Sequence, residues 1–236
     1  MKNKKSITRT TLKSGILYLI SVLIISSFYS CVKGEDSSLD ITSLSVIHTS
    51  PGLPAIDFYY NGGRINGDSI IAYGDTIPNK FFNSGTASVV VKKYISSTTY
   101  ISTSIEFESE KNYSFFIAGK PNEVTYLLTN DDLSAPASGK AKLRFINLSP
   151  DAPDLSFKMD SGNLFGSMAF KSYSEFSLVD PGIHVISIHN SASGAKLAEQ
   201  NLTIEAGKVY TVWAKGLMTT TENDLALSMQ VVGLQP

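Results

Sequence analysis

The chain has 236 residues, of which 42% are hydrophobic, 10% aromatic and 17% charged. This composition is typical of a globular protein and excludes a long disordered tract. The formal net charge is −1, but the first 30 residues hold five of the 20 basic residues and no acidic residue. The remainder has 15 basic and 21 acidic residues, a net charge of −6, so we expect no surface for nucleic acid.

Residues 1–30 have the layout of a lipoprotein signal peptide. Five cationic residues lie between Lys2 and Lys13, no residue from Ser14 to Ser30 is charged, and the centre, Ile16 to Ile25, is almost entirely apolar. The alternative is a retained transmembrane anchor. That reading is disfavoured because a spanning helix needs about 20 apolar residues.

The chain has one cysteine, Cys31, so it cannot form an internal disulfide. The segment Phe28-Tyr29-Ser30-Cys31 resembles the lipobox of bacterial lipoproteins, although Phe28 and Tyr29 replace the usual leucine and small residue. The resemblance implies that Cys31 is lipidated after cleavage. Its acyl chains would then hold the rest of the protein at a membrane surface.

A polar tether is expected over residues 31–42. Its start, Val32-Lys33-Gly34-Glu35-Asp36, resembles the short signal that sends Bacteroidetes lipoproteins to the cell surface, and an ordinary tether is the alternative. The expected location is therefore the outer membrane of the cell envelope, lipid-anchored and surface-exposed.

The rest of the chain contains a repeat. The segment Ser45 to Tyr60, SVIHTSPGLPAIDFYY, returns 99 residues later within Leu143 to Met159, LRFINLSPDAPDLSFKM. Both copies keep a Ser-Pro pair, a second proline and alternating apolar residues, the pattern of two strands joined by a turn. The repeat predicts two domains of similar fold.

Each copy contains about seven short segments of strand character, separated by turns such as Asn61-Gly62-Gly63 and Asp180-Pro181-Gly182. We therefore predict an all-β protein with two tandem immunoglobulin-like β-sandwich domains after the cleaved signal peptide. The predicted boundaries are 43–130 for the first sandwich, 131–140 for a linker and 141–236 for the second sandwich.

Three segments of the second copy, RFINLSPDAPDLSF, DPG and LTIEAGKVYTVWAKG, resemble the bacterial family called domain of unknown function 4397 (DUF4397). The resemblance is close over Leu143 to Gly216, whereas the first copy is degenerate, with Pro51-Gly52-Leu53-Pro54 in place of Pro-Asp-Ala-Pro. It implies secreted or lipid-anchored proteins, often with tandem sandwich domains. The family has no assigned activity.

Catalysis is not expected, and neither is a cofactor. A hydrolase needs a nucleophile beside a base, or paired carboxylates in a cleft. The chain has three histidines, and none recurs in the other copy: His48 aligns with Asn147, His184 with Ala87 and His189 with Lys92.

Three aspartates of the second copy, Asp151, Asp154 and Asp160, could supply oxygen ligands for calcium. The simpler interpretation is ordinary turn chemistry, because aspartate is common in turns. The first copy has none of these carboxylates and carries Gly52, Ala55 and Asn61 instead. We therefore predict no metal site.

Exposed aromatic side chains are the better candidates for binding, because they can stack on sugars or anchor a partner. In both copies, apolar residues alternate along the strands and define the face that points to the core. Tyr59, Phe116 and Trp213 are therefore predicted to lie on the other face of their strands. The alternative for Phe116 and Trp213 is burial under a loop or by the neighbouring domain.

Two triplets, Asp68-Ser69-Ile70 and Asp75-Thr76-Ile77, resemble the O-glycosylation acceptor of Bacteroidetes envelope proteins. Such triplets also occur by chance, so glycosylation of Ser69 or Thr76 stays open.

These observations favour a non-catalytic cell-envelope lipoprotein that displays β-sandwich modules for contact with a protein or a carbohydrate. The alternative is a periplasm-facing subunit that binds a partner in an envelope complex. An unrecognised enzyme is the third possibility.

Overall fold

The computed structural model describes residues 40–234; the predicted signal peptide, Cys31 and most of the tether lie outside the described residues. Within that range the structure consists of β-strands, turns and one 3-10 helix, η1 (Asn223–Leu225). None of the helical structure in that range is long and apolar enough to cross a membrane.

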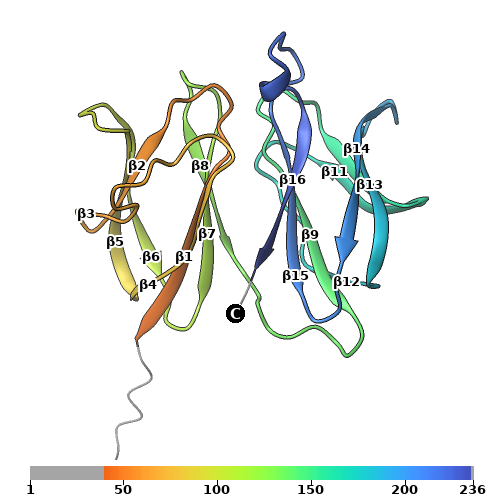
Figure 1. Cartoon of the computed structure of the whole chain (residues 1–236), viewed down its shortest axis with the longest axis horizontal. Helices are drawn as coiled ribbons and strands as arrows, with labels where there is room; N and C mark the ends of the chain where they lie inside the picture. Colours follow the sequence, from red (N-terminus) through yellow and green to blue (C-terminus); the bar gives the residue numbers. More distant parts are fainter. Residues whose placement is uncertain (1–39, 235–236) are drawn as a thin grey trace, which may run out of the picture. The chain divides into compact units, whose positions relative to one another are not determined.

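The first sandwich consists of two four-stranded sheets, seen as two layers in Figure 1. One has the strand order β4-β1-β7-β8 and the other β3-β2-β5-β6. The strands are β1 (Ile41–His48), β2 (Ile56–Tyr60), β3 (Gly63–Arg64), β4 (Thr76–Asn83), β5 (Gly85–Lys93), β6 (Thr99–Phe107), β7 (Asn112–Ala118) and β8 (Thr125–Asn130).

The second sandwich has sheets of order β12-β9-β15-β16 and β11-β10-β13-β14. Its strands are β9 (Ala141–Asn147), β10 (Leu155–Met159), β11 (Gly162–Met168), β12 (Ser177–Val179), β13 (Gly182–Asn190), β14 (Lys196–Ile204), β15 (Val209–Lys215) and β16 (Ser228–Leu234). The two sandwiches have the same strand order: each strand of the second corresponds to the strand of the first whose number is eight lower.

In both sandwiches the first strand pairs in parallel with the seventh. Leu44 lies opposite Tyr113 in β1 and β7, and Leu143 lies opposite Tyr210 in β9 and β15. The prediction of an all-β fold with two immunoglobulin-like sandwiches is confirmed.

Each described sandwich has eight strands, one more than the seven predicted. In the first sandwich, β3 and β4 lie on either side of the loop formed by residues 65–75. Strand β4 is difficult to recognise from sequence. It is an edge strand that contains Pro78, and a bulge in β1 between Leu44 and Val46 interrupts its pairing.

Each sandwich encloses its own hydrophobic core. Phe58, Val91 and Phe115 from the two sheets are fully buried in the first core, and Phe145, Phe157 and Ile188 in the second. Strands β5 and β6 alternate between buried and exposed residues, as expected for strands with one face toward solvent.

Strands β1, β7, β9 and β15 do not alternate, because nearly all their residues are buried. Their second face forms a third hydrophobic cluster shared by the two sandwiches. Its buried members are Ile47, Phe116, Ala118, Ile146, Leu148 and Trp213. The sheets that contain β1 and β9 are therefore covered on both faces.

A buried ion pair joins the two sandwiches beside this cluster. The Nη2 atom of Arg144, in β9, lies 2.6 Å from Oδ1 of Asp131, and both side chains are at most 3% exposed. The Arg144 Nε–H donates to the Thr211 hydroxyl (2.9 Å), while Asp131 accepts from the hydroxyls of Ser114 (2.6 Å) and Thr129 (2.8 Å). This hydrogen bonding stabilises two charges that would otherwise be costly to bury.

The segment between β8 and β9, residues 131–140, is held against the sandwiches at two points. Asp131 forms the ion pair, and the side chain of Leu133 is 6% exposed and packs against Val209 and Leu234 of the second sandwich. The segment predicted as a linker is thus part of the interface.

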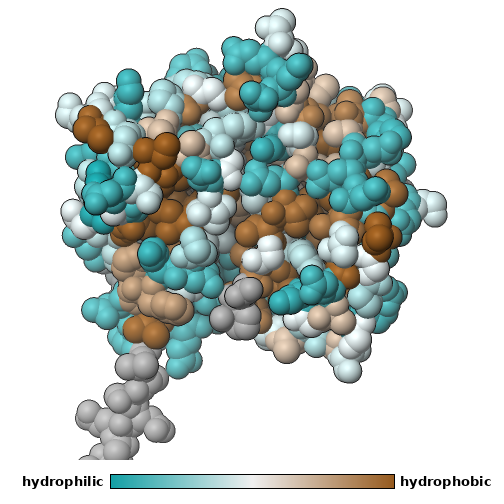
Figure 2. All heavy atoms as spheres, in the orientation of Figure 1, coloured by the Kyte–Doolittle hydropathy of each residue, from teal (hydrophilic) through white to brown (hydrophobic). Residues whose placement is uncertain are grey.

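On the face shown in Figure 2, hydrophobic residues form several separate patches with polar residues between them. This face therefore presents no single continuous apolar surface.

Replacing Arg144 with methionine should lower the free energy of unfolding by about 3–5 kcal/mol, because the Asp131 carboxylate would stay buried without its cation. Urea denaturation followed by the fluorescence of Trp213, the only tryptophan, measures this change. The control is Lys140→Met, which removes a solvent-exposed ion pair with Asp180 (2.5 Å) and should change the free energy of unfolding far less, because water screens the pair. Equal effects of the two substitutions would contradict a structural role for the buried pair.

Candidate binding face of the first sandwich

The outer face of the sheet β3-β2-β5-β6 carries a row of side chains that crosses all four strands. Tyr59 lies opposite Arg64 on one side and Val90 on the other, and Val90 lies opposite Ser102. Side chains of successive strand residues point to opposite faces. Because Phe58 belongs to the core, Tyr59 points outward.

Lys92 lies beside Tyr59 on the same face. Its ammonium nitrogen is 5.2 Å from the centre of the Tyr59 ring, a cation–π contact. Both residues are half-buried, whereas the nearby hydroxyl residues Ser88, Ser102 and Ser104 are exposed. The row therefore combines an aromatic ring, cationic groups and hydroxyl groups.

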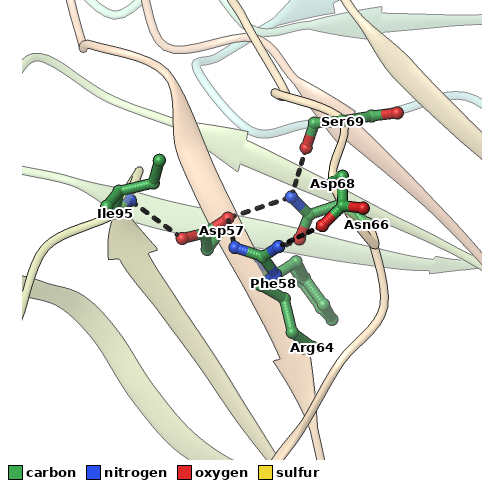
Figure 3. Close-up of polar contacts among 7 residues, drawn as sticks. All are labelled: Asp57, Phe58, Arg64, Asn66, Asp68, Ser69 and Ile95. Atoms are coloured by element: carbon green, nitrogen blue, oxygen red, sulfur yellow. Dashed lines mark hydrogen bonds and ion pairs between the residues drawn. The ribbon is translucent and has the colours of Figure 1, made fainter.

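A buried carboxylate underlies this face (Figure 3). Asp57 is 2% exposed and lies two residues before Tyr59 in β2. Its Oδ1 accepts hydrogen bonds from Asn66 Nδ2 (3.0 Å) and, at 3.4 Å, from Arg64 Nη1; its Oδ2 accepts from the backbone N–H of Ile95 (3.0 Å). Two separate segments, one at the end of β3 and one between β5 and β6, thus converge on one aspartate.

Asn66 extends this network into the loop after β3. Its side-chain oxygen accepts from the backbone N–H of Phe58 (3.2 Å), and its Nδ2 also donates to the carbonyl of Ser69 (2.6 Å). The loop is therefore tied to β2 through an amide that is itself buried. These bonds fix the two residues of β2 that precede Tyr59.

Ile95 is held in a strained conformation at the edge of the face. Its φ is 47°, in the left-handed region that β-branched residues rarely adopt, and its side chain is 75% exposed. Such strain persists where surrounding contacts fix it, and here the Ile95 N–H is bound by Asp57. The result is an exposed apolar side chain on a residue whose backbone is fixed by Asp57.

The second sandwich lacks this arrangement. Lys158 lies at the place of Tyr59, opposite Ser187, and Ser156 lies at the place of Asp57, opposite His189. The outward aromatic ring and the buried carboxylate therefore belong to the first sandwich alone, and Lys158 offers a matched position for control substitutions.

The other two predicted aromatic residues are not part of an open surface. Phe116 and Trp213 are 0% exposed, and their rings pack edge to face with centres 5.9 Å apart. The expectation that they contact a ligand is corrected here, because the sheet faces that carry them cover each other. Of the three predicted residues, Tyr59 alone lies on an accessible face.

The three aspartates of the second copy are engaged separately. Asp151 accepts from the Met218 backbone N–H (2.8 Å) and the Thr219 hydroxyl (2.7 Å), Asp154 from Ser167 (2.8 Å), and Asp160 bonds to His184 (2.8 Å). Between residues 40 and 234, no group of three or more His, Cys, Asp or Glu side chains could hold a metal ion. Each aspartate orders a turn or loop.

The histidines occupy three unrelated environments. His48 is fully buried, and His184 lies between Asp160 and the Asp180 carbonyl. His189 Nε2 lies 3.0 Å from the Ser187 hydroxyl, but its Nδ1 faces the Gly194 carbonyl (3.1 Å), not a carboxylate. This Ser–His pair on the outer face of a sheet lacks the acidic residue that orients the base in a triad.

The two triplets that resemble glycosylation acceptors differ in accessibility. Ser69 is exposed in the loop after β3, whereas Thr76 is half-buried in β4, opposite Ile47. Both border a pocket of about 360 Å³ that also includes Asn66 and Ile71.

Sequence reasoning found Tyr59 but missed Asp57, Asn66 and Arg64. An aspartate between Ile56 and Phe58 looks like an ordinary outward polar residue. The one available signal is that the repeat carries Ser156 at this place, so the carboxylate is specific to the first copy.

A family model described as "Domain of unknown function (DUF4397)" matches residues 42–158, from β1 to β10. This match supports the family resemblance for the first sandwich and the beginning of the second. The search of curated proteins found no match.

Among solved structures, the chain is similar to the crystal structure of CBMbc (family CBM26) from Eubacterium rectale Amy13K in complex with maltoheptaose. The identity is 10%, the alignment covers 83% of this chain and 98% of that chain, and the TM-score is 0.28. A similarity at this TM-score supports no conclusion about function.

The pH dependence of stability should show opposite contributions from two histidines. Burial lowers the pKa of His48 below its ordinary value of about 6.5. As the pH drops below about 6.5, the unfolded chain therefore binds a proton at this histidine more readily than the folded chain does, and the free energy of unfolding falls. The hydrogen bond to Asp160 raises the pKa of His184, so its contribution is present below about pH 6.5 and is lost as the pH rises through the folded pKa.

His48→Asn, which copies Asn147 of the second sandwich, should therefore reduce the loss of stability between pH 7 and pH 5. His184→Gln should increase that loss. Urea denaturation across this pH range measures both, and a shift of both variants in the same direction would contradict the assignment.

Proposed function

We propose that the protein is a non-catalytic, lipid-anchored lipoprotein of the cell envelope whose first sandwich contacts a glycan through the face around Tyr59. The observation that carries this proposal is an outward aromatic ring held on a fixed backbone. Aromatic side chains supply stacking surface at a small cost in conformational entropy. Neighbouring hydroxyl and cationic groups can bond to sugar hydroxyls.

The position of this face also favours the proposal. The sheet β4-β1-β7-β8 is covered by the third hydrophobic cluster, whereas the alternating burial of β5 and β6 leaves the other sheet open on its outer side. A glycan chain can lie along such an open sheet. The buried Asp57 network ties β2 to the loop after β3 and to the backbone of Ile95.

The absence of a catalytic role is supported by the surroundings of the titratable groups. Asp151, Asp154 and Asp160 order turns or loops. Within residues 40–234, none of the three histidines contacts both a hydroxyl group and a carboxylate. The lipid anchor rests on the sequence around Cys31, and surface display rests on the segment that follows it.

Replacing Tyr59 with alanine should weaken glycan binding about tenfold or more, because stacked aromatic residues are typical binding hot spots. A glycan array on the purified protein identifies ligands, and calorimetry then compares the variants. Lys158→Ala is the matched control on the second sandwich and should bind like the native protein. A Tyr59→Ala variant with unchanged affinity would refute this face as the site.

Replacing Cys31 with serine should move the protein from the membrane fraction to the soluble fraction, because acyl chains on that sulfur provide the anchor. Immunoblots of fractionated cells measure this, with Ser38→Ala as the control in the tether. Unchanged membrane association would refute lipidation. Protease treatment of intact cells then separates surface display from the periplasm-facing alternative, in which the protein is protected until the outer membrane is opened.

A further inference from the structure

We propose that the sugar recognised at this face carries a carboxylate, as in a uronic acid. This inference rests on the proposed function and names the class of glycan. It follows from the charges that surround Tyr59, taken one at a time.

The carboxylate of Asp57, two residues before Tyr59 in β2, is withdrawn from the surface. Asp57 is 2% exposed and already accepts hydrogen bonds from Arg64, Asn66 and the Ile95 backbone. Because Asp57 is buried and both of its carboxylate oxygens are hydrogen-bonded, it is not exposed to an anion placed above the sheet.

Two cations flank the ring on the outer side. Arg64 lies directly opposite Tyr59 in the ladder, and its side chain is 30% exposed. Its contacts with Asp57 and with the exposed Asp68 are long, at 3.4 Å and 3.5 Å. Arg64 therefore keeps guanidinium N–H groups available for a further acceptor.

Lys92 provides the second cation. Its ammonium nitrogen lies 5.2 Å from the centre of the Tyr59 ring, and none of the described Asp or Glu residues lies within 4.0 Å of that nitrogen. A sugar ring stacked on Tyr59 would place its substituents within reach of this ammonium. A carboxylate there would form a charge-assisted hydrogen bond that a neutral hydroxyl does not match.

The overall charge limits the kind of anion. The sequence after residue 30 carries a net charge of −6, so a polymer of high charge density meets general repulsion. The local pair of cations favours isolated carboxylates over a densely sulfated chain. The geometry thus fits a glycan with one acidic group per sugar or fewer.

The test compares acidic oligosaccharides with their methyl esters, which have the same backbone without the charge. Trigalacturonic acid, triglucuronic acid and trimannuronic acid are each titrated into the purified protein by calorimetry beside their methyl esters. At least one acid should bind about tenfold more tightly than its ester, and that difference should shrink in 0.5 M salt.

Lys92→Gln should reduce the affinity for that acid severalfold and leave that of the ester unchanged, while Arg64 retains part of the preference for the acid. Lys158→Gln, which removes a cation from the matched face of the second sandwich, should alter neither. Fluorescence of Trp213 checks that both variants keep the native interface.

The outcomes separate the two proposals. If a neutral glycan or the esters bind in a way that depends on Tyr59 but not on Lys92, the carboxylate inference is wrong and the glycan-binding face stands. If no acid binds more tightly than its ester, the inference is likewise refuted. If no glycan of any class binds, the proposed function fails together with it.

Discussion

The buried ion pair between Arg144 and Asp131 determines much of the architecture. Its hydrogen bonds reach Ser114 and Thr129 of the first sandwich and Thr211 of the second, so removing either sandwich would leave charged groups unpaired. The guanidinium also lies 4.6 Å from the centre of the Phe176 ring. The attraction within a buried ion pair is largely offset by the cost of removing both charges from water, so the pair adds little net free energy of unfolding. It does define one arrangement of the groups around it.

That arrangement decides which surfaces remain for recognition. The hydrophobic cluster around Phe116 and Trp213 closes one sheet of each sandwich, so the outer faces of the other two sheets are left open. On the first of these, Asp57 organises β2 and two loops beneath an outward tyrosine. On the second, lysine and serine occupy the corresponding places. Two sandwiches of the same strand order therefore offer different surfaces.

The sequence allowed the fold class and the repeat to be predicted, because alternation and turn residues are local signals. The repeat also placed Tyr59 outward correctly. The repeat could not reveal what covers an outward position. Side chains alternate between the two faces of a strand in the same way whether the outer face lies in water or under another sheet. The run Phe115-Phe116-Ile117-Ala118 was the available warning, because four consecutive apolar residues indicate burial on both sides. The Asp57 network could not be predicted, since its donors come from two segments that only tertiary folding brings together.

The central position of β1 has a mechanical consequence. Under the proposed anchoring at Cys31, tension between the membrane and a ligand held at Tyr59 runs through the covalent chain along β1 and then β2. Strand β1 pairs with β4 on one side and β7 on the other, so a pull along its axis loads both ladders of hydrogen bonds in shear at once. The second sandwich lies outside this force path, yet it covers one face of β1 through Ile47. It would act as a clamp that resists extraction of the strand, although it makes no contact with the ligand.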